Sequence, residues 1–211
     1  MKLSKVFITG CDFRTEWQLP FFVNNFKKHN PDARLMIFDF GMETSLYPEM
    51  RKSLRGATEK GWFMKPRAMA TASVMADHVC WLDTDCEVRA NLDGIWDHVE
   101  PNKLAMVEDV PWSTRRGEVW HNSGVVAFSH RPNILDEWYA AVNNNPIQGD
   151  QEVLHEIVKI GLRRSIHITS LPREYNTLRL DLLDGTSPSD IKIMHWTGQL
   201  GKTHIRKIMN D

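Results

Sequence analysis

The sequence Val79-Cys80-Trp81-Leu82-Asp83-Thr84-Asp85 carries the strongest structural signal in this 211-residue chain. Its first four residues are a continuous apolar run, which is typical of a central strand buried on both faces of a sheet. Two carboxylates follow directly, where such a strand would end. Because open α/β sheets bind ligands beyond the carboxyl ends of their strands, Asp83 and Asp85 are candidate ligand-binding residues.

The segments around this stretch predict alternating strands and helices. Upstream we expect strands at residues 5–8 and 34–38, a helix at 15–29 with Pro20 in its first turn, and a helix at 66–76. Downstream we expect strands at 104–107, 124–128, 164–169 and 191–194, helices at 133–142 and 150–160, and a final polar, basic tail. Residues 47–60 give no clear pattern. The order predicts one α/β domain over residues 1–211, with a mostly parallel mixed central sheet flanked by helices.

Composition excludes several classes of protein. The chain has 26 Lys and Arg against 27 Asp and Glu, a formal net charge of −1, so no global positive field favours nucleic acid or an anionic membrane. No apolar run reaches the roughly 18 residues of a membrane span, and the N-terminus lacks the apolar core of a signal peptide. Three cysteines are too few for a disulfide framework and fit a reducing compartment. We therefore expect a cytoplasmic protein.

Asp83 and Asp85 have two interpretations. With 15 aspartates in the chain, about one Asp-x-Asp triplet arises by chance, so the triplet alone slightly favours a turn with capping carboxylates. Its place at the end of a buried strand supports the other interpretation, in which both carboxylates bind Mg²⁺ or Mn²⁺. Such a cation could bridge a diphosphate and neutralise charge as a phosphate leaves.

Three later polar segments support the second interpretation. Residues 122–128 form a polar turn entering a strand, residues 149–152 form a polar cluster opening a helix, and residues 195–202 follow the last strand. In this order the four segments resemble the nucleotide-sugar-dependent glycosyltransferases of the GT-A fold, especially the retaining, glycogenin-like and lipopolysaccharide-galactosyltransferase-like branch. The resemblance runs from Val6 to Lys202. It implies a Rossmann-like GT-A domain that transfers a hexose or deoxyhexose from a UDP-sugar to a hydroxyl of a glycan or glycoprotein acceptor, with retention of configuration.

The resemblance also implies a metal site and a diphosphate loop. Asp83 and Asp85 match the family's acidic metal motif and His195 matches the histidine that completes it, a donor set that shifts preference from Mg²⁺ toward Mn²⁺. Gly198 and Lys202 match the loop that closes on the diphosphate. Lys202 lies one residue further from Gly198 than is usual, and Thr203 replaces the following proline, which weakens the assignment of the lysine's contact.

The remaining site residues are carried over in the same way. The end of the first strand implies uridine binding, a basic residue is implied near the nucleotide, and the side chains at the polar turn and the helix start line the donor sugar. An amide is a poor nucleophile, so a front-side reaction, with the metal and Lys202 stabilising the departing diphosphate, is favoured over covalent catalysis. The residues implied to bind the nucleotide sugar are Thr9, Gly10, Cys11, Asp12, Arg67 (with Lys65 as the alternative), Thr84, Asn122, Gly198 and Lys202, and those implied in catalysis are Asp150, Gln151 and Lys202.

Other interpretations stay open. A sugar-1-phosphate nucleotidyltransferase would need a glycine-rich, arginine-bearing loop, and Thr9-Gly10-Cys11-Asp12-Phe13-Arg14 is a poor version of one. An aspartate-nucleophile phosphatase would carry its motif after the first strand, and a non-catalytic nucleotide-sugar-binding module could keep the fold without the metal site. Glu108 and Asp109 could contact sugar hydroxyls or lie in a solvated turn. The chain is also similar to N-terminal glycosyltransferase domains of chlorella-virus capsid-glycan proteins, which implies a piece of a longer protein acting in the host cytoplasm.

Overall fold

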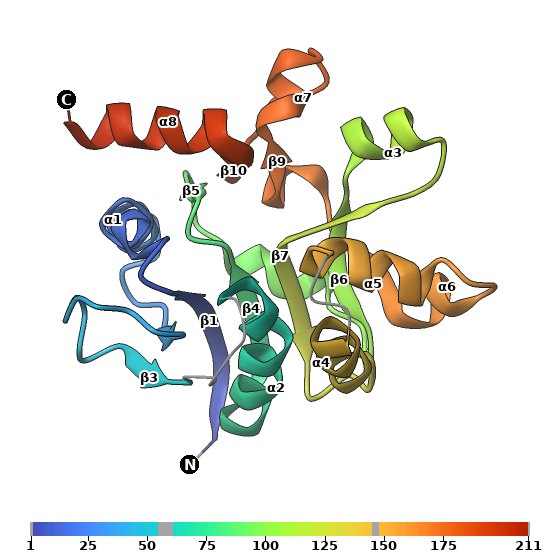
Figure 1. Ribbon diagram of the computed structural model, residues 1–211, viewed down its shortest axis with the longest axis horizontal. Helices are drawn as coiled ribbons and strands as arrows, with labels where there is room; N and C mark the ends of the chain where they lie inside the picture. Colours follow the sequence, from blue (N-terminus) through green and yellow to red (C-terminus); the bar gives the residue numbers. More distant parts are fainter. Residues whose placement is uncertain (1, 55–60, 145–147, 211) are drawn as a thin grey trace.

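A seven-stranded sheet forms the centre of the computed structural model, which describes residues 2–54, 61–144 and 148–210 (Figure 1). Its strand order is β3-β2-β1-β4-β7-β6-β8. The strands are β1 (Leu3–Cys11), β2 (Leu35–Asp39), β3 (Arg51–Ser53), β4 (Ala76–Leu82), β6 (Leu104–Glu108), β7 (His121–Ser129) and β8 (Ile168–Ser170). The apolar run quoted first is therefore in the middle strand, as predicted.

The direction of β7 brings polar residues together at one edge of this sheet. The pairs β1–β2, β1–β4, β2–β3 and β6–β8 are parallel, whereas β7 runs antiparallel to both β4 and β6. Leu82 at the end of β4 pairs with Val125 of β7. The start of β7, at Asn122 to Gly124, therefore lies at the carboxyl edge, where β4 delivers Asp83. The mostly parallel mixed sheet expected from the sequence is confirmed.

Helices cover both faces of the sheet. On one face α2 (Lys65–Met75), α4 (Ile134–Asn144) and α5 (Asp150–Val158) pack on alternate strand residues such as Ile8 and Trp81. On the other face α1 (Leu19–His29) and the 3-10 helix η3 (Asp93–His98) pack on the intervening residues, such as Phe7 and Leu82. The alternation follows from the strand period of two, and the double coverage explains why β4 is apolar throughout its last four residues.

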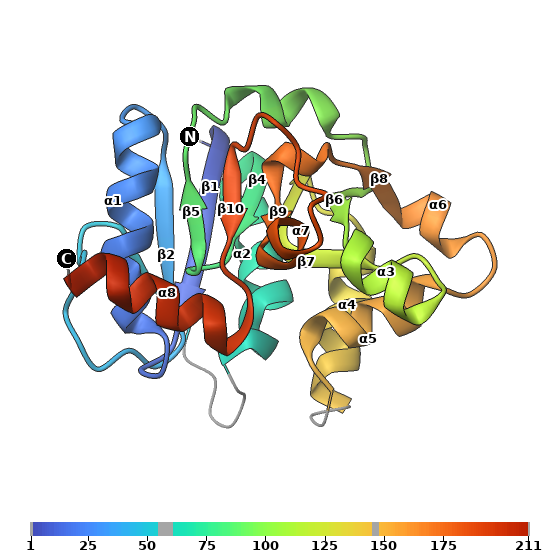
Figure 2. The ribbon, with the colours of Figure 1, turned by 90° about the horizontal axis from the view of Figure 1, so that it is seen from above.

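A second, three-stranded sheet stands beyond the carboxyl edge (Figure 2). It has the order β5 (Cys86–Val88), β10 (Ile193–His195) and β9 (Thr177–Leu178), with β10 antiparallel to β5 and parallel to β9. His195 pairs with Cys86 in this sheet, so the last strand places the histidine beside the Asp83-Thr84-Asp85 turn. The final strand expected at 191–194 is shifted by one to two residues, and β5 and β9 are short strands that the sequence did not indicate.

Two segments differ from the sequence expectations. The strand expected at 164–169 is for the most part helix α6 (Arg163–His167), and only its end belongs to β8. The tail after His195 is helix α8 (Gly198–Asn210), which lies across α1 and buries Ile205 against Phe21 and Trp196 (Figures 1 and 2). The expected loop that closes on a diphosphate is therefore the first turn of a helix.

The other expected elements are present with small shifts at their ends. Helix α1 begins at Leu19 with Pro20 in its first turn, preceded by the 3-10 helix η1 (Glu16–Gln18). The unclear region 47–60 contains β3, while residues 55–60 lie outside the described part. The remaining elements are η2 (Gly61–Met64), α3 (Val110–Arg116), η4 (Arg173–Tyr175) and α7 (Arg179–Leu183). None of the helices described is long and apolar enough to span a bilayer.

Candidate functional site

The turn after β4 is fixed by contacts from three other elements. The backbone N–H of Asp83 donates to the carbonyl of Gly124 at 2.8 Å, and the N–H of Trp196 donates to the carbonyl of Asp85 at 3.0 Å. Between them, the hydroxyl of Thr84 donates to Oε1 of Gln18 at 2.6 Å. The turn is thus tied to β7, to the segment after β10 and to η1. This holds both carboxylates at the sheet edge rather than leaving a free surface turn.

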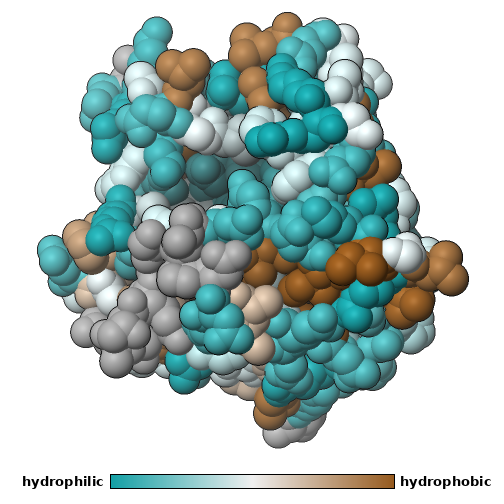
Figure 3. Space-filling model, turned by 45° about the vertical axis from the view of Figure 1, so that its right-hand side comes forward, coloured by the Kyte–Doolittle hydropathy of each residue, from teal (hydrophilic) through white to brown (hydrophobic). Residues whose placement is uncertain are grey.

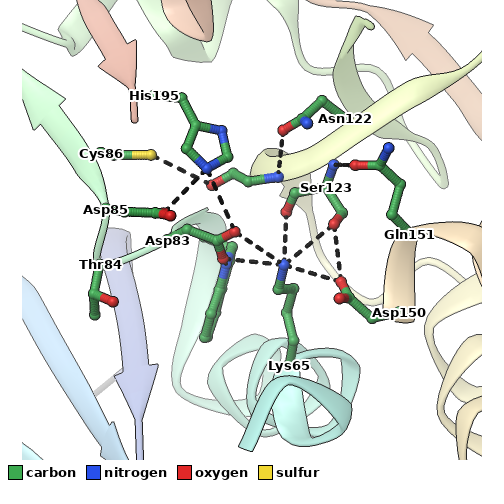
Figure 4. Close-up of polar contacts among 12 residues, drawn as sticks. Lys65, Asp83, Thr84, Asp85, Cys86, Asn122, Ser123, Asp150, Gln151 and His195 are labelled. Atoms are coloured by element: carbon green, nitrogen blue, oxygen red, sulfur yellow. Dashed lines mark hydrogen bonds and ion pairs between the residues drawn. The ribbon is translucent and has the colours of Figure 1, made fainter. Parts of the chain in front are cut away.

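A buried ammonium group lies at the centre of the site (Figure 4). Lys65, in the first turn of α2, places Nζ 3.0 Å from Oδ1 of Asp83 and 2.9 Å from Oδ2 of Asp150. It also donates to the carbonyl of Ser123 at 3.1 Å and to its hydroxyl at 3.2 Å. Burial favours the neutral amine, but the carboxylates of Asp150 and Asp83 outweigh it and hold the pKa of Lys65 above its usual value. Lys65 is therefore charged and joins three elements.

Asp83 differs from Asp85 in its surroundings. Asp83 also accepts from Nε1 of Trp81 at 2.6 Å, and burial raises its pKa although Lys65 opposes the rise. Asp85 has the opposite shift: burial is opposed by the charge and the hydrogen bond of His195, and by Lys202, so its pKa lies below the usual value. The carboxyl group of Asp85 therefore ionises more readily than that of Asp83.

His195 faces these carboxylates through one ring nitrogen. Its Nε2 lies 3.1 Å from Oδ1 of Asp85 and 3.9 Å from Oδ2 of Asp83, while Nδ1 lies 3.0 Å from Oδ1 of Asn176. Burial disfavours the imidazolium, but Asp85 outweighs burial and raises the pKa of His195. Gly124 makes room for the ring, because a Cβ there would lie 2.0 Å from Cε1 of His195. The three predicted ligands thus converge from β4, β5 and β10.

Cys86 is a further potential ligand that the sequence did not single out. The ligand atoms of Asp85, Cys86 and His195 lie within 4.8 Å of one another. The thiol is fully buried and lies 3.9 Å from the carbonyl of Gly124, and burial holds its pKa well above the usual value. Because the thiolate is the form that binds metals, we favour the carboxylates and the imidazole as donors.

Two pockets meet at this cluster, and Figure 3 shows the surface hollowed above the middle of its view. The first, of about 170 Å³, extends toward the end of β1 and is lined there by Gly10, Cys11 and Asp12. The second, of about 480 Å³, extends toward β7, α5 and α7. The residues that line both pockets are Lys65, Asp83, Asp85 and Asp150.

The remaining predicted residues divide between these pockets. Thr84 and Lys202 line the first, and Asn122, Gln151 and Gly198 line the second. Gln151 accepts from the backbone N–H of Ser123 at 3.1 Å, so its carbonyl is held by β7. Asn122 donates to Oδ2 of Asp109 at 3.3 Å, which brings Asp109 into the second pocket.

Two of the predicted residues, Arg67 and Thr9, line neither pocket. Arg67 faces another side of α2, where it lines a separate groove with Tyr139 at 5.9 Å from the ring centroid. Of the two basic candidates, Lys65 is therefore the one brought to the site. Thr9 is fully buried, one residue before Gly10.

Sequence reasoning missed Gln18, Asn176 and the indole of Trp81. Gln18 holds Thr84, Trp81 holds Asp83, and Asn176 holds His195. No local motif marks Gln18 or Asn176, because each meets its partner only through the packing of distant segments. The one available signal was Trp81, two residues before Asp83 on the same strand.

The chain was compared with known proteins. No family model matches it, and no curated protein sequence matches it. Among solved structures it is similar to the galactosyltransferase LgtC in complex with donor and acceptor sugar analogs, with a TM-score of 0.68 and 13% identity over 97% of this chain and 94% of that chain. It is similar to the glycosyltransferase GlyE of Streptococcus pneumoniae TIGR4, with a TM-score of 0.67 and 18% identity over 94% of this chain and 56% of that chain. The bifunctional glycosyltransferase WbbM has a TM-score of 0.60 and 11% identity over 94% of this chain and 46% of that chain. At these identities the likeness establishes the architecture, and the chain has the GT-A fold of these glycosyltransferases.

Proposed function

We propose that the chain is a metal-dependent glycosyltransferase that moves a hexose or deoxyhexose from a UDP-sugar to a hydroxyl of a glycan or glycoprotein, with retention of configuration. The observation that carries the proposal is the meeting of two pockets at Lys65, Asp83, Asp85 and Asp150. A transferase needs such a junction, because donor and acceptor must approach one reacting carbon from different sides. A glycan acceptor such as that of a viral capsid fits the sequence resemblance.

The donor atoms at the junction suit a divalent cation. Two carboxylates and one imidazole nitrogen favour Mn²⁺, with Mg²⁺ as the alternative. The Nδ1 side of His195 is taken up by Asn176, which leaves Nε2 for the cation. A bound cation would neutralise charge on a diphosphate leaving group. Asp83, Asp85 and His195 are therefore the proposed ligands.

The first pocket is the proposed nucleotide site. Gly10 lets the backbone come close to a base, and Cys11 and Asp12 line the same wall. Lys202, on the first turns of α8, lines this pocket near Asp85. Its ammonium group would hold the diphosphate as negative charge develops on it.

The second pocket is the proposed site of the sugar and the acceptor. Asp150 and Gln151 sit at the start of α5, where Lys65 and Ser123 fix their side chains. Asn122 lies beside them at the start of β7. We propose that these groups orient the sugar by hydrogen bonds and that the acceptor attacks from the side of the departing diphosphate, so that no protein nucleophile is required. Residues 1–211 would form a single domain for this task.

The test is titration calorimetry of UDP into the chain with Mn²⁺, and then with EDTA. Micromolar binding that EDTA abolishes supports the proposal, and Asp85→Ala should abolish it as well. The matched control is Asp77→Ala, because Asp77 is an exposed carboxylate at the other end of β4 that pairs with Lys2. A control that binds normally shows that the loss belongs to the site.

Other outcomes would favour the alternatives. UDP binding that does not depend on metal, with no sugar transfer from any UDP-sugar, would indicate a binding module. Release of pyrophosphate from UTP and a sugar-1-phosphate would indicate a nucleotidyltransferase. No UDP binding in either condition would overturn the proposal and favour the phosphatase interpretation.

A further inference from the structure

The position of the proton on the His195 ring follows from one group that can only donate, the backbone N–H of Gly124. The backbone N–H of Gly124 donates to the side chain of Asn122 at 2.9 Å. A backbone N–H can only donate, so the atom that it meets is the oxygen Oδ1. The amide nitrogen of Asn122 then donates to Oδ2 of Asp109 at 3.3 Å. The orientation of the Asn122 amide is thereby fixed.

The orientation of the Asn122 amide determines that of the Asn176 amide, which contacts the histidine. One of its amide atoms lies 2.9 Å from Oδ1 of Asn122 and must be the nitrogen, because an oxygen there would meet another acceptor. The amide oxygen of Asn176 therefore faces Nδ1 of His195, at 3.0 Å. An oxygen can only accept, so Nδ1 carries the proton. Nε2 lies 3.1 Å from the carboxylate of Asp85, which also accepts, so without a cation Nε2 carries a proton as well. A bound cation would take the place of that proton, while Nδ1–H stays on Asn176.

The hydrogen-bonded side chains of Asn122, Asn176 and His195 are enclosed by the protein. Asn176 has no exposed surface, and Asn122 and His195 are 6% and 4% exposed. Asn176 is held by η4 and β9, and His195 by β10, which pairs with β9 in the second sheet. Water therefore has little opportunity to replace the amide oxygen, and the ring has no second acceptor of comparable geometry at Nδ1 among the described residues.

We propose that Asn176 is a positioning residue that holds the proton on Nδ1 of His195, so that Nε2 is the ring nitrogen whose lone pair binds a cation shared with Asp83 and Asp85. The proposal rests on the proposed function, in which Nε2 binds a divalent cation. Asn176 touches neither the cation nor the sugar, and acts only through His195. Residues that orient a metal-binding histidine typically change metal affinity 10- to 100-fold when they are lost.

Mn²⁺ affinity is the first measurement, by electron paramagnetic resonance and calorimetry without UDP. Asn176→Leu keeps the volume but removes the acceptor, and we expect Mn²⁺ to bind about 10- to 100-fold more weakly. Asn176→Asp keeps an oxygen for Nδ1–H but loses the donor to Asn122, and we expect a smaller loss of Mn²⁺ affinity than in Asn176→Leu. The matched control is Asn30→Leu, because Asn30 is also buried and bridges Ala90 and Leu92 far from the site. Equal Mn²⁺ affinity in Asn176→Leu and the wild type would overturn the proposal.

The proton on Nδ1 is the second measurement, and it requires no metal. In the metal-free wild type, nitrogen-15 correlation spectra should show a proton on Nδ1 of His195, hydrogen-bonded to the oxygen of Asn176. Asn176→Asp should keep that signature, whereas a wild-type ring without a proton on Nδ1 would overturn the proposal. If the wild type binds no Mn²⁺, the proposed function fails, but the spectra still decide whether Asn176 sets the ring.

Discussion

Lys65 shows how much one buried charge determines at the residue scale. Its ammonium group is 4% exposed and is shared by Asp83, Asp150 and Ser123. Removing one member of a buried ion pair leaves an uncompensated charge, which costs far more than losing a surface pair. The arrangement of the site therefore depends on Lys65 more than on any exposed lysine.

Lys65→Met should lower the free energy of unfolding at neutral pH, in EDTA, by about 3 kcal/mol, because Asp83 and Asp150 stay partly buried beside each other without a cation. Urea unfolding followed by circular dichroism measures this loss. The matched control is Lys103→Met, because Lys103 pairs with Glu100 at 2.8 Å on the surface and should cost at most about 1 kcal/mol. Equal small losses in both variants would contradict the prediction.

His121 should make the protein sensitive to acid. Burial, followed by the charges of Arg164 and His155, lowers the pKa of His121 to about 4. The unfolded chain binds a proton near pH 6.5 and the folded chain only near pH 4, so stability is full above pH 6.5 and falls as the pH drops between these values. His121→Gln should reduce this fall by about 2 to 3 kcal/mol in urea unfolding at both ends of the window, since one pKa unit corresponds to about 1.4 kcal/mol. An unchanged pH dependence in the variant would show that other groups cause it.

Individual site residues differ in how far sequence reveals them. Asp83 and Asp85 were predictable because strand-end position is a local property, whereas His195 was selected only through its resemblance to a family pattern. The resemblance favoured Arg67 over Lys65, whereas the structure brings Lys65 to the site, because the choice depends on the side of α2 that faces β4 and β7. Asn176 could not be found at all, since its role depends on a contact across 19 positions of the chain.

At the scale of elements, β7 can lie close to β10 because Gly124 has no side chain. Gly124 leaves room for the His195 ring, and a Cβ there would lie 2.5 Å from Nδ1 and 2.0 Å from Cε1. Because both positions lie in paired strands, the backbones have little freedom to separate. The ring would have to move instead, away from Asn176 and Asp85.

Gly124→Ala should therefore weaken Mn²⁺ binding by at least about tenfold, as is typical when a metal-binding histidine is displaced, while the fold is kept. Calorimetry measures the affinity and circular dichroism the fold. The control is Gly185→Ala, which has open space around the new Cβ but a positive φ of 67°. It should cost about 1 kcal/mol of stability and leave Mn²⁺ binding unchanged. Normal binding in Gly124→Ala would show that the ring is not constrained by β7.

The elements that sequence analysis predicted well are those with a strong internal pattern, such as α2 and β4. The segment after His195 was expected to be a loop because Gly198 and Lys202 match the loop that closes on the diphosphate in the family that the sequence resembles. In the structure a Cβ on Gly201 would lie 2.0 Å from the carbonyl oxygen of Trp196, so the glycine permits α8 to pack against the end of β10. The short strands β5 and β9 exist because β10 pairs with both of them, and pairing between distant segments leaves no local signal.

At the scale of the whole molecule, the two pockets meet because one strand, β7, runs antiparallel to its neighbours β4 and β6. If β7 ran parallel to β4, Asn122 and Ser123 would start at the opposite edge of the sheet from Asp83. Antiparallel β7 instead places them beside Lys65, and α5 adds Asp150 from the same side. The proposed nucleotide site beside β1 and the proposed sugar site beside β7 thus share the charged residues Lys65, Asp83, Asp85 and Asp150.

A ligand that fills this junction should stabilise the whole fold. UDP-sugar with Mn²⁺, at about 100 times its dissociation constant, adds about 2.7 kcal/mol of stability by mass action if it binds only the folded chain. For a chain of this length that corresponds to a rise in Tm of roughly 5 to 10 °C, which differential scanning calorimetry can measure. EDTA should abolish the rise, and Lys202→Ala should reduce it, because Lys202 reaches the first pocket from α8. Arg67→Ala serves as the control: its groove lies elsewhere on α2, so it should keep the full rise. A rise that persists in EDTA would mean that the nucleotide sugar binds without bridging to Asp83 and Asp85, which would separate nucleotide binding from the proposed metal site.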